Sequence, residues 1–415
     1  MFPTLKLFLL MISSLSLFYL EMSDHVDMCY LGSASFIDYL SKPMLLMTIW
    51  VFVSMSLGMK SKKIYLTLVL MTVSTAIFFM TSSWIVFFSM FEFSLVPIFF
   101  LIISESKQPE RLSAGYMLFL YTIFASAPLF VKICNLPMDS IPLSLLQMVE
   151  KEYTVVTMIG FTLAFLIKLP LFGVHLWLLK AHVEATMVGS MYLAGILLKF
   201  GAYGIIRVVH MTYWFDIVSV FTICMSVGGV GALYSALSSA LETDEKLKVA
   251  FMSVCHMNLS LCCLLFLSEW SLNGYIMYML CHSLISSALF SWVSISYDHS
   301  GSRSTMINKG MISSASITGL GMLVLALNAS VPPSMGFMSE FMLLTPMSMV
   351  FFFFMLLNMM TILMNSISSV IMYLSSSEIP QSGKSEMEVK LTSYLRLSWL
   401  ILPNFPLLFM SELLF

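Results

Sequence analysis

Residues 154–178 read TVVTMIGFTLAFLIKLPLFGVHLWL, and this stretch decides the fold of the chain. It is long and apolar enough to cross a hydrocarbon layer roughly 30 Å thick as a helix. Lys168 nevertheless lies inside it, several helical turns from either end, and Pro170 follows two residues later. Proline removes a backbone donor and clashes with the preceding turn, so the helix should break or kink there. The stretch therefore predicts a membrane helix that is interrupted beside a buried charge.

The whole chain shares this apolar character. Hydrophobic residues make up 59% of its 415 residues and charged residues only 10%, far below the roughly 25% typical of soluble domains. A soluble core is excluded, nucleic acid is not indicated as a partner, and an all-α membrane bundle is predicted. Windows of about 19 residues predict about 13 transmembrane spans, near residues 3–20, 43–59, 64–82, 84–103, 113–133, 154–178, 187–208, 216–238, 248–267, 274–296, 310–345, 350–374 and 391–412.

A second span, the eleventh, is also interrupted. Residues 310–345 are too long for one membrane helix, and they carry the sequence VPPSMG at 331–336. Paired broken helices in two halves of a bundle are typical of inverted repeats with an ion site at the breaks. Prolines also kink transmembrane helices where no ion site exists. The ion-site interpretation is favoured because each break lies beside a buried charge, Lys168 in one span and Glu340 in the other.

Basic residues in the loops predict the orientation. They fall almost entirely on one side of the bundle, the exceptions being Lys42 and Lys151. Because the cytoplasmic or matrix side carries the excess of Lys and Arg, the N-terminus is expected inside and the C-terminus outside. The basic loop residues of the inner side are Lys60, Lys62, Lys63, Lys107, Arg111, Lys180, Lys246, Lys248, Arg303, Lys309, Lys384 and Lys390.

Few charged residues lie well inside the spans, and they are Glu92, Lys168, Lys199 and Glu340. A charge at a helix centre costs roughly 2.5–3.5 kcal/mol on insertion scales, so these side chains should face the bundle interior or water. Burial and a Glu–Lys contact shift a lysine's proton affinity in opposite directions, so its protonation can change when the partner moves. That property suits a proton pump. The alternative is a structural Glu92–Lys168 pair that locks the fourth and sixth spans together. Basic residues near span ends, which can reach the lipid headgroups, are Lys6, Lys132, Arg207 and Arg396.

Histidines supply further candidates. His256 and His282 lie in the ninth and tenth spans, where a ring that titrates near neutrality can pass protons between waters. A single intramembrane histidine can equally be a hydrogen-bonded core residue. His175 and His182 follow Lys168 by seven and fourteen residues, so a helical continuation would put them near its face, and they rank second. No metal site is expected, because the histidines are scattered and no cysteines form a C-x-x-C pair.

Several strings together resemble the NADH dehydrogenase subunit 4 family, the antiporter-like membrane subunits of respiratory complex I. The resemblance covers roughly residues 84–376 in uninterrupted order. The strings are Phe91-Glu92 with Leu95-Val96-Pro97, Gln108-Pro109-Glu110-Arg111-Leu112, Lys168-Leu169-Pro170-Leu171 leading to His175-Leu176-Trp177-Leu178, Lys180-Ala181-His182-Val183-Glu184-Ala185, Leu197-Leu198-Lys199 with Tyr203-Gly204 and Arg207, Thr243-Asp244 with Lys246, Ser253 with His256-Met257, His282-Ser283-Leu284 with Ser286-Ser287, and Val331-Pro332-Pro333 with Ser339-Glu340.

The resemblance implies a proton relay made of two half-channels. In this family the residue matching Glu92 partners the one matching Lys168, and the one matching Lys199 is the central relay lysine. The histidines matching His256 and His282 carry the proton sideways. The residue matching Glu340 is the exit-side group, and a glutamate there resembles this subunit rather than its two paralogues. The chain departs from the family at Leu179 and Thr186, where proline is usual.

The resemblance also implies the setting. This chain would bind no cofactor, while NADH, FMN, iron–sulfur clusters and ubiquinone would act in other subunits. Its partners would be complex I membrane-arm subunits, including two antiporter-like paralogues, and membrane lipid. The 38 methionines fit translation in mitochondria, so we expect the mitochondrial inner membrane, with the N-terminus in the matrix and the C-terminus in the intermembrane space.

The sequence predicts three segments along the chain, and two alternative functions stay open. Residues 1–83 would form N-terminal helices, one span fewer than the family's usual number, residues 84–376 the antiporter-like core, and residues 377–415 an inner loop and C-terminal helix. The chain could instead be a subunit of a multi-subunit cation/proton antiporter. It could also be a non-conducting membrane scaffold, although a scaffold would be expected to lack the central charges.

Overall fold

A computed structural model of the chain describes residues 29–30, 36–57, 59, 61–105, 109–135, 155–211, 214–264, 266, 268–310, 315–350, 352–377 and 390–405. The predicted span at 3–20 lies outside these residues. Two short strands, β1 (Cys29–Tyr30) and β2 (Phe36–Ile37), form an antiparallel pair. The other elements of the described chain are helices.

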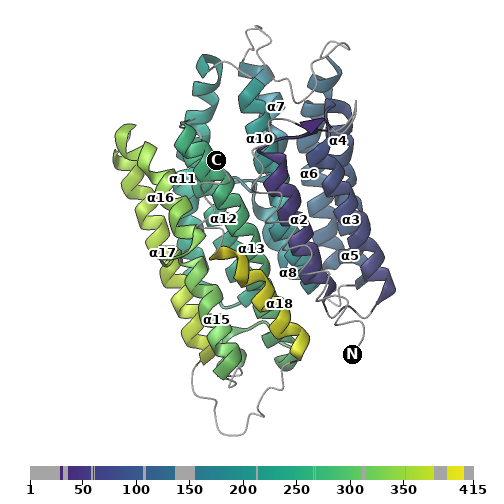
Figure 1. Ribbon diagram of the computed structural model, residues 1–415, viewed down its shortest axis with the longest axis vertical. Helices are drawn as coiled ribbons and strands as arrows, with labels where there is room; N and C mark the ends of the chain where they lie inside the picture. Colours follow the sequence, from purple (N-terminus) through teal and green to yellow (C-terminus); the bar gives the residue numbers. More distant parts are fainter. Residues whose placement is uncertain are drawn as a thin grey trace.

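The helices stand side by side in one bundle (Figure 1). Those of the first half are α2 (Ser41–Ser56), α3 (Lys62–Met80), α4 (Trp84–Phe93), α5 (Leu95–Glu105), α6 (Arg111–Cys134), α7 (Val155–Lys168), α8 (Leu176–Glu184), α9 (Met187–Tyr192), the π-helical turn η1 (Leu193–Leu197) and α10 (Leu198–Met211). Those of the second half are α11 (Trp214–Leu241), α12 (Glu245–Leu264), α13 (Glu269–Ser300), α14 (Thr305–Asn308), α15 (Ala315–Asn328), α16 (Met335–Val350), α17 (Phe352–Ser377), α18 (Leu391–Ile401) and the 3₁₀ turn η2 (Leu402–Asn404).

The predicted membrane architecture is confirmed. Within the described residues, 8 helices are long and apolar enough to cross a membrane. Every predicted span from 43–59 onward corresponds to a helix, or to two or more consecutive helical segments. The spans at 154–178 and 310–345 are each divided into two helices by a longer non-helical stretch, residues 169–175 and 329–334, and α7 and α15 are among the shorter apolar helices.

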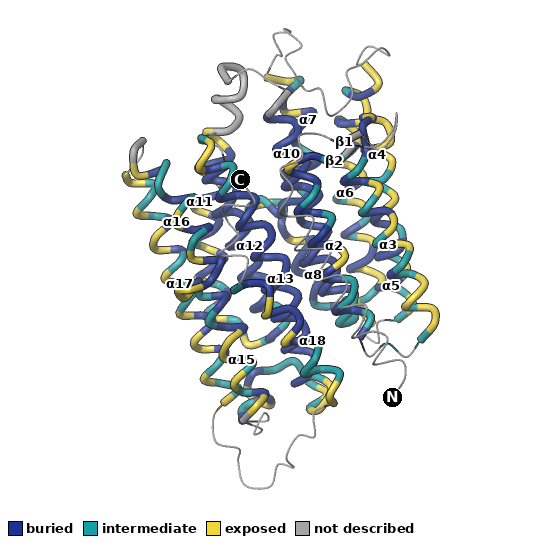
Figure 2. The backbone as a smooth tube through the Cα atoms, viewed as in Figure 1, coloured by how far each residue is buried: buried dark blue, intermediate teal, exposed yellow. Residues whose placement is uncertain are grey.

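Burial separates a central group of helices from a peripheral group. The most apolar windows of α9–α10 and α13 are 100% buried, and that of α12 is 89% buried, whereas those of α3 and α17 are 33% and 28% buried. Figure 2 shows the same contrast along the backbone. Because hydrocarbon solvates apolar side chains, peripheral helices can expose them while polar groups gather inside. Lys199, His256 and His282 lie on the central helices.

The first break runs from Leu169 to His175, between α7 and α8. A broken helix leaves backbone groups that must be satisfied inside the protein. The side chain of Asn258 on α12 does this, since its Nδ2 donates to the Pro170 carbonyl at 3.1 Å and its Oδ1 accepts from the Phe172 amide at 3.2 Å. Gly173 adopts φ +98°, a conformation that favours glycine. The break is therefore built by two helices together.

The second break runs from Ala329 to Ser334, between α15 and α16. Here Ser330 donates its hydroxyl to Glu340 on α16 at 2.6 Å. The chain passes through this break in the opposite direction along the bundle from the first (Figure 1), as expected for paired inverted elements. The two interruptions predicted from their prolines are confirmed.

Four of the predicted details are wrong. Helix α8 continues to Glu184, so Lys180 is helical rather than in a loop, and α13 extends beyond 274–296 at both ends. Hydropathy windows trim such ends because they are polar. Arg207 does not extend to a headgroup, because it is buried and its Nη2 lies 2.6 Å from Asp38 Oδ2. Arg396 is also buried and donates to the Leu57 carbonyl.

The C-terminal helix α18 packs against α2, which is far away in sequence. Trp50 and Trp399 stack with ring centroids 4.0 Å apart and planes 8° apart. Each indole donates to the other residue's carbonyl, Trp50 at 3.0 Å and Trp399 at 3.2 Å. This reciprocal pair satisfies both indole N–H groups within the apolar bundle.

Candidate functional site

Lys168 is buried at the end of α7, immediately before the first break. Its Nζ donates to the Phe91 carbonyl at 2.8 Å and lies 3.1 Å from the centroid of the Phe91 ring. A second ring, that of Phe200, lies 5.5 Å away. Aromatic faces and a carbonyl are neutral groups that stabilise an ammonium in place of water. The protein thus solvates the ammonium, and no full counter-charge contacts it among the described residues.

Glu92 lies next to Phe91 and within electrostatic range of Lys168. Among the described residues no ion pair joins the two side chains directly, and Glu92 Oε1 is buried without a hydrogen-bond partner there. The two residues come together across α4 and α7, but the direct contact of a locked structural pair is not what is found.

Lys199 lies at the centre of the bundle, fully buried on α10 just after the π-helical turn η1. Its Nζ donates to the Ala194 carbonyl at 2.9 Å, and this carbonyl belongs to that turn. The same Nζ lies 2.8 Å from Nδ1 of His282 on α13. Single π turns inside α-helices are frequent at functional sites. A lysine and a histidine of the predicted set are therefore in direct contact.

His282 and His256 are neighbours, with ring centroids 5.7 Å apart. His256 Nδ1 is hydrogen-bonded to the Tyr278 hydroxyl. Its Nε2 lies 3.2 Å from Asn328 Oδ1 and 3.0 Å from Asn365 Nδ2. Three polar side chains from three other helices therefore surround this ring.

A small cavity connects the histidines to the second break. It is about the size that one water occupies, and its lining includes His256, Tyr278, His282, Asn328 and Ser330. His282 Nε2 has no hydrogen-bond partner among the described residues. Ser330 in turn bonds the buried carboxylate of Glu340. A row of polar groups thus runs from Lys199 through both histidines and this cavity to Glu340.

The second-rank histidines lie outside this row of bonds. His175 Nδ1 accepts from the Gly173 amide at 3.2 Å, so it shapes the first break. His182 is buried and stacks on Phe290, with centroids 4.6 Å apart and planes 9° apart, and neither ring nitrogen has a partner among the described residues. The spacing argument that linked both to Lys168 is wrong, because the break cancels the helical period between them.

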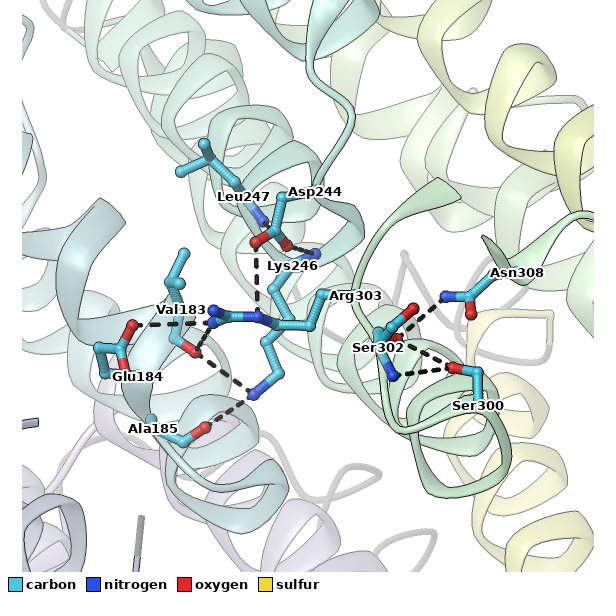
Figure 3. Close-up of polar contacts among 10 residues, drawn as sticks. All are labelled: Val183, Glu184, Ala185, Asp244, Lys246, Leu247, Ser300, Ser302, Arg303 and Asn308. Carbon is cyan, nitrogen blue, oxygen red and sulfur yellow. Dashed lines mark hydrogen bonds and ion pairs between the residues drawn. The ribbon is translucent and has the colours of Figure 1, made fainter. Parts of the chain in front are cut away.

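Beyond His182, charged side chains form a cluster at the C-terminal end of α8 (Figure 3). Arg303 donates to the Val183 carbonyl at 2.8 Å and lies 3.7 Å from Glu184 and 3.5 Å from Asp244. Lys246 donates to the Ala185 carbonyl at 2.9 Å. These cations lie at the C-terminal end of α8, where the helix dipole favours positive charge. We call this the basic end.

The sequence analysis missed the uncharged members of the site. Asn258, Asn328, Asn365, Tyr278 and Ser330 hold the breaks and surround His256. Asparagine inside an apolar span was the available signal, because an unpaired amide is costly in hydrocarbon. Within the described part of the chain, no three His, Cys, Asp or Glu side chains form a metal-binding group.

These features define a class: a polytopic helical membrane protein with two broken helices and a buried row of ionisable side chains between them. Residues 81–366 match the family model described as NADH:quinone oxidoreductase/Mrp antiporter, TM. The chain belongs to this family.

Similar proteins agree with the family. NADH-ubiquinone oxidoreductase chain 4 of Aedes aegypti is 40% identical over 61% of this chain and 57% of that relative's length. The protein of the same name in Ceratitis capitata is 36% identical over 74% of this chain and 71% of its own length. The resemblance inferred from the sequence strings is confirmed.

Solved structures share the fold. A chain of respiratory complex I from Thermus thermophilus has a TM-score of 0.79 at 19% identity, covering 99% of this chain and 94% of that one. A chain of the Mrp complex from Dietzia sp. also has a TM-score of 0.79, at 17% identity, covering 95% of this chain and 46% of that one. At these identities the likeness concerns the fold alone.

Proposed function

We propose that this chain is a proton-translocating membrane subunit of complex I, and that it couples NADH:ubiquinone electron transfer in other subunits to proton transport. The observation that carries the proposal is the polar row from Lys199 to Glu340. Hydrogen bonds or a shared cavity join each member to the next. Such a row suits proton hopping between side chains and water.

The position of each residue in the polar row indicates its role in proton transfer. Lys168 would hold a proton near Glu92, and Lys199 would pass one to His282. His256 would receive it across the short distance between the two rings. Glu340, reached through Ser330, would release it on the far side of the second break. A water molecule in the cavity would give His282 Nε2 a hydrogen-bond partner.

The setting belongs to the same proposal. The relatives' names support a mitochondrial membrane. The excess of Lys and Arg in the loops of one side supports the orientation, with the basic end and the N-terminus in the matrix and the C-terminus in the intermembrane space. Partners would be the two antiporter-like paralogues, other membrane-arm subunits and lipid, and the redox cofactors would lie in other subunits. The division at residues 83 and 376 stays a prediction.

Two observations separate the proposal from its rivals. The Mrp complex shares the fold, but the curated relatives quoted above carry the name NADH-ubiquinone oxidoreductase chain 4. A non-conducting scaffold would have no need of a buried lysine in contact with a buried histidine, because such groups are costly in a membrane.

The central test replaces Lys199. Lys199→Met keeps most of the side-chain volume while removing the charge, and Lys199→Ala removes both. Both variants should leave assembly largely intact and lower proton pumping and coupled NADH:quinone turnover by roughly 100-fold or more, the range for losing a positioned proton-transfer group. Lys180→Ala, on the exposed face of α8, is the control. An assembled Lys199→Met complex with a normal proton-to-electron ratio would refute the relay role.

A further inference from the structure

Two asparagine side chains contact the same ring nitrogen of His256, one through its amide oxygen and the other through its amide nitrogen. Asn328 presents its Oδ1, an acceptor, at 3.2 Å from Nε2, and Asn365 presents its Nδ2, a donor, at 3.0 Å from the same atom. A neutral imidazole nitrogen is either a donor or an acceptor. The two contacts therefore cannot both be hydrogen bonds at the same moment.

Neighbouring groups fix the orientation of each amide. Asn365 Nδ2 lies 3.4 Å from the Asn328 backbone carbonyl, which requires a donor there. Asn328 Nδ2 faces Met252 Sδ at 3.6 Å, a weak acceptor, which leaves its oxygen toward the ring. Turning either amide over would place oxygen against an acceptor. The opposition at Nε2 is thus built by the surroundings of both asparagines.

The other ring nitrogen is bonded to a group that accepts either arrangement. His256 Nδ1 contacts the hydroxyl of Tyr278, which can donate or accept. With the proton on Nε2, the ring donates to Asn328 and accepts from Tyr278. With the proton on Nδ1, it donates to Tyr278 and accepts from Asn365. Each tautomer makes two hydrogen bonds.

We propose that Asn328 and Asn365 are positioning residues that balance the two tautomers of His256, so that the ring can reset after each proton it passes. The inference rests on the proposed function, in which His256 relays protons. A proton that binds one nitrogen gives an imidazolium, and the proton on the other nitrogen then leaves. No other bond changes, but the ring is left as the opposite tautomer. When the hydrogen-bond partners stabilise both tautomers of His256 equally, the ring returns to its starting tautomer without a cost in free energy.

The test removes the partners singly and together in the assembled complex. Asn365→Leu leaves only the acceptor, Asn328 Oδ1, beside His256 Nε2 and so favours the Nε2–H tautomer. Asn328→Leu leaves only the donor, Asn365 Nδ2, and so favours the Nδ1–H tautomer. Each should lower coupled turnover roughly fivefold, the factor for a bias of one hydrogen bond. The double variant removes both biases, so it should turn over faster than either single variant. Structural damage alone would instead accumulate.

The matched control is Asn358→Leu on the same helix, α17. Asn358 is buried and donates to the Phe354 carbonyl at 3.0 Å, so its loss also removes an amide from the membrane interior. It should leave turnover near wild type. Assembly is measured for every variant on native gels.

The outcomes are distinguishable. A double variant no faster than the slower single variant overturns the tautomer balance. Wild-type turnover in both single variants, together with loss of pumping in His256→Gln, also overturns the tautomer balance. In that case the proposed relay role of His256 still stands. If His256→Gln pumps normally, the relay role of His256 falls, and this inference falls with it. Recovery in the double variant supports it.

Discussion

The two buried lysines of the site are held, among the described residues, by groups other than full counter-charges. Lys168 is bonded to a carbonyl and covered by an aromatic ring, and Lys199 is bonded to a carbonyl and an imidazole. A tight salt bridge would hold both charges strongly, and breaking it would be costly. Neutral partners stabilise the ammonium less, so a lysine can release its proton when a neighbouring charge changes.

Glu92 provides a test of this at the level of one residue. Glu92→Gln removes the only negative charge found near Lys168 among the described residues, and it should lower pumping roughly tenfold, the factor for about 1.4 kcal/mol of lost interaction. Glu92→Asp keeps the charge with a shorter reach, so its loss should be smaller. Pumping is measured in vesicles that contain the assembled complex. Glu269→Gln, exposed at the start of α13, is the control. Equal losses for Asp and Gln would show that charge at this position is not what matters.

The charged members of the site could be predicted from the sequence, because a charge inside an apolar span is conspicuous. Their partners could not. The carbonyl that binds Lys168 belongs to Phe91, which has no feature that marks it. The asparagines around His256 come from α15 and α17, and only packing brings them to one ring. The sequence shows which buried charges need partners, and the packing of the helices determines which groups become those partners.

At the level of helices, proline predicts that a break exists but not what holds it. Asn258, from a helix 86 residues later than Phe172, satisfies an amide and a carbonyl at the first break. Unsatisfied groups in a membrane cost several kcal/mol each. Helix α8 also ends later than hydropathy alone predicted, because its last turn is polar.

Asn258→Leu should therefore loosen the first break specifically. The Phe172 amide loses its acceptor, and hydrogen exchange there should accelerate about 5- to 150-fold, corresponding to about 1–3 kcal/mol for an unsatisfied group. Exchange is followed by mass spectrometry on peptides that cover the break, with the body of α7 as an internal reference. Asn358→Leu should leave these peptides unchanged. If the break exchanges at the wild-type rate in Asn258→Leu, another group holds it.

At the level of the whole molecule, the two ends of the described chain are packed together. Trp50 and Trp399 are 349 residues apart in sequence and share two hydrogen bonds. Hydropathy predicted both helices, but no sequence pattern indicated that they meet. Helix order in a membrane bundle follows from side-chain packing, since hydrocarbon solvates all the apolar faces alike.

Trp399→Leu should detach this contact. The change removes the stacked ring and the indole donor, with a loss of about 3–5 kcal/mol for truncating a buried aromatic side chain. Peptides from α18 should then exchange faster, and less complex should survive mild detergent. Trp270→Leu, at an exposed tryptophan of α13, is the matched control. Protection of α18 at the wild-type level would mean that its other contacts, including the hydrogen bond of Arg396 to the Leu57 carbonyl, suffice to anchor it.

One helix, α12, is bonded to both breaks. Asn258 bonds the first break at 3.1 and 3.2 Å, and His256, two residues earlier, lies 3.2 Å from Asn328 at the end of α15. If α12 slid by one helical turn, about 5.4 Å, the contacts at both breaks would be lost together. The contacts at the two interruptions therefore depend on the position of the same helix. By thermodynamic reciprocity, whatever favours one arrangement of this helix at the first break favours the matching arrangement at the second by the same free energy.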